Sequence, residues 1–279
     1  MNIEYYFDIY GTYELKDGLY NVSGDIELIK KVDKLPIKFG KVTGSFDCYG
    51  NNLKSLDGSP ISVGYNFDCY GNNLTSLKGS PTHVDGGFYC NNNKLTSLEG
   101  CPSYVGGNFY CNNNNLTSLE GSPNSVGGDF YCYNNNLTSL EGCQESVGGD
   151  FSCYKNKLTS LEGCPRSVGG NFEIDDNDLT SLEGSPISLG GNFDCCNNNL
   201  NSLKGAPKRV DGYFYCFDTN LNSLEYCPTF VGGDFYCDST DLNSLEYCPA
   251  FVGGEFFCDN ELHNTKEYKK FKILEKLRK

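Results

Sequence analysis

Apolar residues recur along this chain at a fixed interval of 21 positions. Phenylalanine marks the interval eleven times without an insertion, at positions 46, 67, 88, 109, 130, 151, 172, 193, 214, 235 and 256. Cysteine follows two positions after ten of these phenylalanines, and Ile174 takes its place in the other copy. Leucines follow seven and ten positions after each of the first ten, and valine or leucine stands four positions before. The consensus unit is F-x-C-x-x-N-x-L-x-S-L-x-G-x-P-x-x-V-G-G-x.

A unit of this size cannot bury its own apolar side chains, but stacked units bury them in continuous ladders. Phenylalanine and cysteine, two positions apart, point to the same side of a strand. Each copy is therefore predicted to contain one short strand, Phe46 to Cys48 in the first, beside parallel strands of its neighbours. The recurring glycine and proline later in the unit favour turns over a helix. The pattern predicts a solenoid of about eleven coils with a parallel sheet on one face.

The run F-x-C-x-x-N-x-L-x-x-L is similar to the L-x-L-x-x-N-x-L core of leucine-rich repeats. The form C-x-N-N-x-L-T-S-L-E-G-x-P-x-x-V-G-G-x-F resembles the short 21-residue repeats of proteins from tailed bacteriophages and some giant viruses. Residues 35–42 resemble the usual lead-in to those arrays, so the resemblance covers about residues 35–263. It implies a leucine-rich repeat solenoid, mainly β with an irregular convex side. It also implies a binding scaffold without shared catalytic residues.

The two ends of the chain differ from the repeats. Residues 1–45 alternate apolar and polar positions and are predicted to form short strands that cap the array at 46–263. Residues 264–279 are predicted to form a basic amphipathic helix, begun by Asn264 or Thr265. Its apolar stripe is Tyr268, Phe271, Leu274 and Leu277. We expect this helix to cap the last coil, because an open edge strand invites aggregation. Binding of a membrane or a partner remains the alternative.

Net charge and the length of apolar runs argue against two classes of binding partner. The formal net charge is −14, and acidic proteins are poorly suited to bind the phosphates of nucleic acids. No apolar run reaches the roughly 20 residues of a membrane helix, and no secretion signal is visible. We therefore expect neither direct nucleic-acid binding nor a membrane partner.

The 16 cysteines include no C-x-x-C pair. We interpret them as buried, reduced thiols that act as small hydrophobes. Reduced thiols indicate a cytoplasmic protein, which means the host cytoplasm if a phage encodes it. Asparagine stands five positions after the first eight phenylalanines, and Thr219 and Thr240 follow in the next two copies. We expect these asparagines to satisfy backbone groups rather than to bind a ligand. No metal or cofactor is predicted.

Variable positions within this constant frame are where function is expected. Residues one before, one after and three after each phenylalanine project away from the core. They are mainly Tyr, Asp and Asn, and none is Lys or Arg. Tyrosine is enriched in binding hot spots. The predicted partner-binding residues are Tyr49, Tyr70, Tyr89, Tyr110, Tyr131, Tyr133, Tyr154, Tyr215, Tyr236, Phe217, Phe257, Asp129, Asp150, Glu173 and Asp175.

These features predict a non-enzymatic scaffold that captures a protein with a basic surface. Given the resemblance to phage arrays, the partner is hypothesised to belong to a host defence system. The alternatives are a DNA-mimicking inhibitor of a nuclease or restriction enzyme, a small-ligand binder, and a virion or structural component. No Ser-His-Asp set, phosphate loop or metal signature supports an enzyme. The sequence leaves the oligomeric state open.

Overall fold

The structure is a computed structural model that describes residues 2–278. It divides into two compact units. The first comprises residues up to Leu137 together with Glu141–Gly148, and the second comprises Thr138–Leu140 together with the residues from Gly149 onward. Each unit is a solenoid of 21-residue coils in which neighbouring coils pair through parallel strands. Five phenylalanine strands lie in the first unit and six in the second, which confirms the predicted solenoid of about eleven coils.

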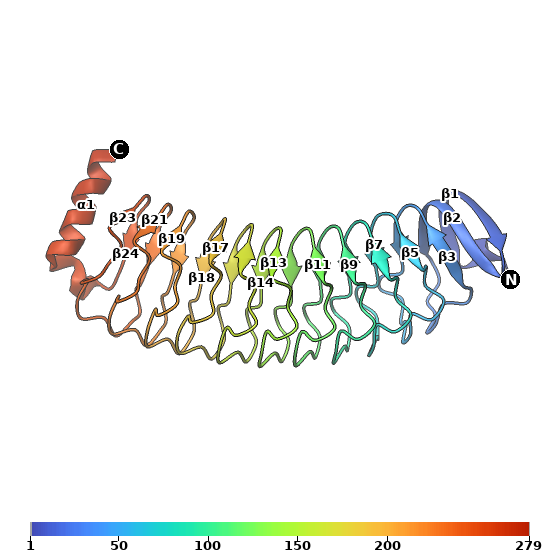
Figure 1. Cartoon of the computed structure of the whole chain (residues 1–279), viewed down its shortest axis with the longest axis horizontal. Coiled ribbons are helices and arrows are strands. Elements are labelled where there is room, and N and C mark those ends of the chain that lie inside the picture. Colours follow the sequence, from blue (N-terminus) through green and yellow to red (C-terminus); the bar gives the residue numbers. More distant parts are fainter. Residues whose placement is uncertain (1, 279) are drawn as a thin grey trace. The chain divides into compact units, whose positions relative to one another are not determined.

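Each coil contributes two short strands, so each unit carries two parallel ladders (Figure 1). The phenylalanine ladder of the first unit comprises β4 (Phe46–Asp47), β6 (Phe67–Asp68), β8 (Phe88–Tyr89), β10 (Phe109–Tyr110) and β12 (Phe130–Tyr131). Its valine ladder comprises β3 (Phe39–Val42), β5 (Ser62–Val63), β7 (His83–Val84), β9 (Tyr104–Val105), β11 (Ser125–Val126) and β13 (Ser146–Val147). The second ladder was not predicted, because its strands carry a single recurring apolar residue and no apolar pair two positions apart such as Phe and Cys.

The second unit repeats the phenylalanine ladder, but its valine side is interrupted. Its phenylalanine ladder comprises β14 (Phe151–Ser152), β16 (Phe172–Glu173), β18 (Phe193–Asp194), β20 (Phe214–Tyr215), β22 (Phe235–Tyr236) and β24 (Phe256–Phe257). Its valine-side strands are β15 (Ser167–Val168), β17 (Ser188–Leu189), β19 (Arg209–Val210), β21 (Phe230–Val231) and β23 (Phe251–Val252). Strand β15 pairs with β17, whereas β19, β21 and β23 form a separate three-stranded sheet.

The core is built from the repeated apolar columns. The phenylalanine rings stack along each unit, as Phe46 and Phe67 do at 5.5 Å between centroids and Phe214 and Phe235 at 5.6 Å. Cysteine and leucine columns lie beside the rings, and nearly all of these side chains are fully buried. Burial raises the pKa of ladder thiols such as Cys69 well above the ordinary value. A buried, protonated thiol packs as a small hydrophobe, as the sequence predicted.

The asparagine column joins neighbouring coils, which confirms its predicted structural role. The Asn177 amide nitrogen donates to the carbonyl oxygens of Cys153, one coil earlier, at 3.2 Å and of Ile174 at 3.1 Å. Its amide oxygen accepts the Leu158 N–H at 3.0 Å. Where Thr219 replaces asparagine, the shorter hydroxyl donates to the Cys216 carbonyl of its own coil at 2.8 Å.

A hairpin begins the first unit. After η1 (Ile3–Tyr5), β1 (Phe7–Lys16) and β2 (Leu19–Leu28) pair antiparallel through a two-residue turn at Asp17 and Gly18, both with positive φ. Strand β2 then pairs in parallel with both β3 and β4, so one strand starts both ladders. The prediction of short strands was therefore wrong in length, since each spans ten residues.

A helix ends the second unit. It begins at Lys266 rather than at Asn264, because Asn260–Asn264 form the 3-10 turn η2, and α1 spans Lys266–Arg278 (Figure 1). The Thr265 hydroxyl accepts the Tyr268 N–H at 3.3 Å, which confirms Thr265 as the N-cap. Phe271 is buried and stacks on Phe256 at 4.7 Å, so the helix caps the last coil. The side chain of Leu277 lies outside the part that the structure describes.

Candidate protein-binding face

The predicted binding residues lie on the surface of the phenylalanine ladder that faces away from the core. We call this surface the outer face; it consists of the residues one before, one after and three after each repeat phenylalanine. Because the strands alternate, Phe109 and Cys111 point inward and are fully buried, while Tyr110 between them lies half-buried on the outer face. Neighbouring coils hold equivalent outer-face residues in register.

Carboxylates occupy the start of this face in the first unit. Glu27, Asp47 and Asp68 lie side by side on β2, β4 and β6. Burial, together with the neighbouring charge of Asp47, raises the pKa of Asp68 from 3.8 to about 6. Burial and the charge of Glu27 raise the pKa of Asp47 as well. Like charges in adjacent register positions repel one another. This column of residues, one per coil, therefore favours the binding of a positively charged group.

Tyrosines continue the same column. The Tyr110 and Tyr131 rings stack at 4.5 Å with their planes 4° apart, and Tyr89 packs edge-on against Tyr110 at 5.2 Å. The Tyr110 hydroxyl accepts a hydrogen bond from the Asn108 amide at 2.9 Å and donates to an Asp129 carboxylate oxygen at 3.4 Å. Tyr133 lies beside Tyr131 at 6.0 Å. The structure therefore brings these predicted residues together as a ladder of packed aromatic rings.

Most of these aromatic residues are less accessible than the sequence suggested. Tyr49 and Tyr70 are 49% and 40% exposed, whereas the other predicted aromatic residues are half-buried because they cover one another. A ring held on both sides by its neighbours offers an edge and a hydroxyl group rather than a free face. These residues project away from the core, but neighbouring side chains partly cover most of their rings.

The second unit repeats the order of carboxylates followed by aromatic residues. Glu173 and Asp194 are adjacent in register, and Asp175 follows Glu173 on the same coil. Burial, then the charge of Asp194, raises the pKa of Asp175 from 3.8 to about 7. Burial also raises the pKa of Glu173 and of Asp194. These carboxylates share a half-buried strip in which each disfavours ionisation of the others.

Aromatic residues complete the column after Asp194. Tyr215 stacks on Tyr236 at 5.0 Å, and Tyr236 stacks on Phe257 at 4.4 Å. Phe217 meets Tyr215 edge-on at 6.4 Å. Tyr154 is half-buried, and the Lys155 ammonium lies 5.6 Å from its ring centroid.

Two predicted acidic residues are engaged by the scaffold itself. The Asp150 carboxylate accepts the Asn171 N–H of the next coil at 2.7 Å. The Asp129 carboxylate accepts a hydrogen bond from the Tyr110 hydroxyl. The backbone N–H of Asp129 donates to the side-chain oxygen of Asn108 at 2.9 Å. The position before each phenylalanine therefore commonly links coils, which explains why Asn and Asp recur there.

Two exposed tyrosines were missed. Tyr65 is 61% exposed and stands where most coils carry glycine, two positions before the repeat phenylalanine. Tyr213 is 40% exposed, and its ring lies over Gly233 so closely that a Cβ there would approach it to 2.5 Å. In both cases the signal was a large residue at a position otherwise occupied by Gly, Asn or Asp.

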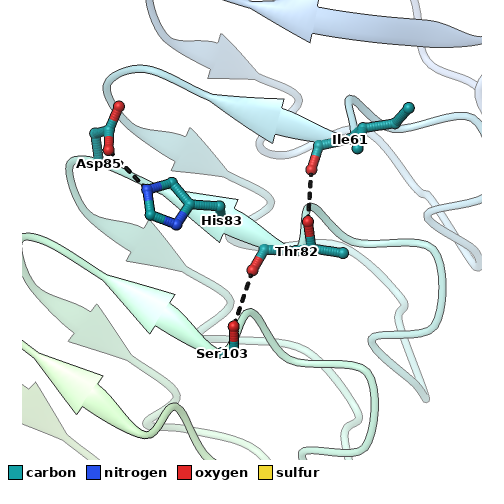
Figure 2. A network of polar contacts seen from close by, with 5 residues as sticks. All are labelled: Ile61, Thr82, His83, Asp85 and Ser103. Atoms are coloured by element: carbon teal, nitrogen blue, oxygen red, sulfur yellow. Dashed lines mark hydrogen bonds and ion pairs between the residues drawn. The ribbon is translucent and has the colours of Figure 1, made fainter.

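The valine side carries a second polar arrangement, shown in Figure 2. His83 lies 2.8 Å from Asp85 and stacks on Tyr104 of the next coil at 4.6 Å. The Thr82 hydroxyl donates to the Ile61 carbonyl at 3.2 Å, and the Ser103 hydroxyl donates to the Thr82 carbonyl at 3.4 Å (Figure 2). These bonds link three consecutive coils and stabilise the turns before the valine strands.

The second unit repeats this arrangement at the same repeat positions. Arg209 lies 2.5 Å from Asp211 and 3.9 Å from the ring centroid of Phe230 in the next coil. Asp85 and Asp211 each replace the first glycine of the V-G-G sequence. His83 and Arg209 stand two positions before them. Because each side chain already has a local partner, we assign both arrangements to the stability of the scaffold.

Among residues 2–278, no group of three or more His, Cys, Asp or Glu side chains is placed to hold a metal ion. Within the same part of the chain, no helix is long and apolar enough to cross a membrane.

No protein-family model matches this chain, and no curated protein sequence matches it. The solved structures that are similar to it in part include the following two. One is the functional domain of InlJ from Listeria monocytogenes, which includes a cysteine ladder; it is 20% identical over 72% of this chain and 50% of that chain, with a TM-score of 0.45. This chain thus spans about half the length of that one. The other is YopM from Yersinia enterocolitica WA-314, 13% identical over 83% of this chain and 78% of that chain, with a TM-score of 0.33.

Proposed function

We propose that this protein is a non-enzymatic scaffold whose outer face binds a partner protein. One observation carries the proposal: in each unit, adjacent carboxylates are followed along the same column by stacked aromatic residues. In the first unit Asp68 precedes Tyr89, and in the second Asp194 precedes Tyr215. Rings that are already held in place lose little entropy on binding, which favours a tight and specific interface.

The chemistry of the outer face supports a partner with a basic surface. A lysine or arginine placed beside Asp47 and Asp68 would relieve their mutual repulsion and favour their charged forms. The exposed rings of Tyr49 and Tyr70 stand two positions further along the same two coils, where they suit a cation–π contact. Association driven by such charges is fast and depends on salt.

The narrower hypothesis is that the partner is a host defence protein met in the host cytoplasm. It rests on the resemblance of the repeats to phage arrays. DNA mimicry receives less support, because aromatic residues interrupt the column of carboxylates in each unit, at Tyr89 and at Tyr215, whereas the phosphates of DNA follow one another without interruption. Excess duplex DNA should therefore not displace the partner. A virion or structural role predicts instead that the protein is recovered in purified particles.

The test is affinity capture from a candidate host lysate with the wild-type protein and two variants. Tyr49→Ala/Tyr70→Ala removes exposed rings from the outer face, while Ile187→Ala changes an 83% exposed residue of the other unit outside that face. We expect one host protein to be captured by the wild type and by Ile187→Ala, and to be lost at least tenfold from the double variant. Equal capture by all three would reject the proposed face. Circular dichroism and thermal unfolding confirm that the variants fold.

A further inference from the structure

The outer edge of β1 is open. Strand β1 pairs with β2 over all ten of its residues, and across residues 2–278 no other strand pairs with it (Figure 1). The strand contains no proline, and ten residues is long for an edge strand. Tyr10, Tyr13 and Leu15 are 62%, 42% and 61% exposed on it. Such an edge is a template for pairing with another strand.

The hydrogen bonds to β2 determine which backbone groups of β1 point outward. The Ile29 N–H donates to the Tyr6 carbonyl at 2.9 Å, so these two residues form a hydrogen-bonded pair. In an antiparallel ladder such pairs recur at every second residue. Asp8, Tyr10, Thr12, Glu14 and Lys16 therefore turn their backbone groups toward β2. The N–H and C=O groups of the intervening residues face solvent at the open edge; these residues are Ile9, Gly11, Tyr13 and Leu15.

We propose that β1 pairs antiparallel with β1 of a second copy of this chain, in the register where the numbers of opposed residues sum to 24. The outward backbone groups of Ile9 then meet those of Leu15, and those of Gly11 meet those of Tyr13. Asp8 stands opposite Lys16 on both sides of the two-fold axis. The pairing covers Leu15 with Ile9 and places the Tyr13 ring beside a glycine, an arrangement that stabilises glycine in sheets.

Charge selects this register among its neighbours. The outward backbone groups of β1 belong to odd-numbered residues. In two paired copies these groups meet only when odd-numbered residues stand opposite one another, so that the two residue numbers of each opposed pair have an even sum. A sum of 22 places Asp8 opposite Glu14 twice, which is repulsive. A sum of 26 places Lys16 opposite Tyr10 and moves Asp8 beyond the end of the opposing strand, so neither charge is matched. A sum of 24 places Asp8 of each copy opposite Lys16 of the other, so both charges are matched.

The proposed interface is isologous and closed, so it forms a dimer rather than a filament. It leaves the outer face free and does not depend on the proposed function. Edge pairing buries little area, and we therefore expect a weak, concentration-dependent dimer. A strand from another protein is the competing occupant, and a charge-exchange experiment separates the two.

The test is sedimentation velocity from about 1 µM to 1 mM, a range that brackets the affinities of small interfaces. The wild type should change from monomer to dimer. Asp8→Lys and Lys16→Asp each oppose like charges twice and should weaken dimerisation by roughly tenfold. A 1:1 mixture of the two variants should restore it, because each then meets its complement. Lys269→Glu, on the exposed side of α1, is the control and should behave as the wild type does.

A monomeric wild type at every concentration would overturn the proposal, as would a mixture that fails to restore the dimer. Hydrogen exchange gives a second readout that does not depend on the variants. The amides of Gly11 and Tyr13 should become protected as concentration rises, while that of Thr12, which faces β2, should be protected throughout. The Tyr49→Ala/Tyr70→Ala variant should dimerise normally, which separates this interface from the outer face.

Discussion

The side-chain nitrogen of Asn72 lies 2.9 Å from the carbonyl oxygen of Cys48, one coil earlier in the chain. The same nitrogen donates to the Cys69 carbonyl at 3.0 Å, and the amide oxygen accepts the Leu53 N–H at 2.9 Å. One buried side chain thus satisfies backbone groups of two coils that water cannot reach.

Replacing Asn72 by alanine should therefore lower the free energy of unfolding by about 2–4 kcal/mol, because several buried groups lose their partners together. Urea titration measures the loss. Asn73→Ala, one residue further along and less buried, should change stability by less than about 0.5 kcal/mol. Equal effects of the two substitutions would show that the amide bonds contribute little.

Thr219→Asn should have the opposite effect. Thr219 occupies the asparagine column, but its hydroxyl donates to a carbonyl of its own coil. An asparagine there should reach the preceding coil and stabilise the protein by about 1 kcal/mol. Protection of nearby amides from hydrogen exchange should rise together with the urea midpoint. A loss of stability would mean that the coil has adapted its backbone to threonine.

Glycines at two positions of the coil should respond differently to substitution. Gly184 has φ 96°, and a Cβ there would lie 2.7 Å from the Leu161 carbonyl oxygen. Gly184→Ala should destabilise the protein by about 1–3 kcal/mol, because the backbone must shift to relieve the contact. Gly50 has φ 62° and open space around it, and Asn92 has φ 53° at the equivalent position. Gly50→Asn should be neutral or slightly stabilising in thermal unfolding, and a loss comparable to that of Gly184→Ala would contradict this account.

The carboxylates of the outer face should destabilise the fold as pH rises. The pKa of Asp175 is raised from 3.8 to about 7, so the folded state binds the proton more tightly than the unfolded state. The resulting penalty is absent below about pH 4, grows between pH 4 and 7, and is complete above pH 7.

Asp175→Asn removes this penalty. It should stabilise the protein by about 1 kcal/mol at pH 8, after allowance for solvent screening, and should have little effect at pH 4. Urea titrations at the two pH values measure the difference, with the exposed Asp241→Asn as control. An equal gain at both pH values would show that the charge is not the cause.

The stability of the last coil should depend on the packing of Phe271. Its ring covers Phe256, so Phe271→Ala leaves a cavity and exposes the end of the core. Exchange of the Cys237 amide, which donates to the Phe257 carbonyl, should accelerate by at least tenfold. Ile273 lies on the same helix but is 59% exposed, and Ile273→Ala should leave the exchange rate unchanged. Similar rates for both variants would show that α1 does not stabilise the coil through this ring.

The repeated columns could be predicted because each residue type occurs in so many copies that chance is excluded. Phe109, Cys111 and Asn114 occupy the places that the 21-residue interval implies. The valine ladder was missed, because two residues such as Ser125 and Val126 carry no alternation that can be recognised.

Exposure of the outer face was also predicted poorly. Whether Tyr131 is open or covered depends on how its ring stacks on Tyr110, and spacing alone does not determine side-chain torsions. Tyr65 stands in the glycine column two positions before its phenylalanine, outside the three variable columns, and Tyr213 stands in the column before the phenylalanine, where Asn and Asp prevail.

The asparagine bonds between coils have a consequence for how such a gene can change. The bonds of Asn72 to Leu53 and Cys48 span 19 and 24 residues, and those of Asn177 to Leu158 and Cys153 span the same intervals. If recombination removed or duplicated one 21-residue segment in frame, each remaining asparagine would find equivalent groups on its new neighbour. The number of coils can therefore evolve in whole steps, separately from the residues that any one coil displays.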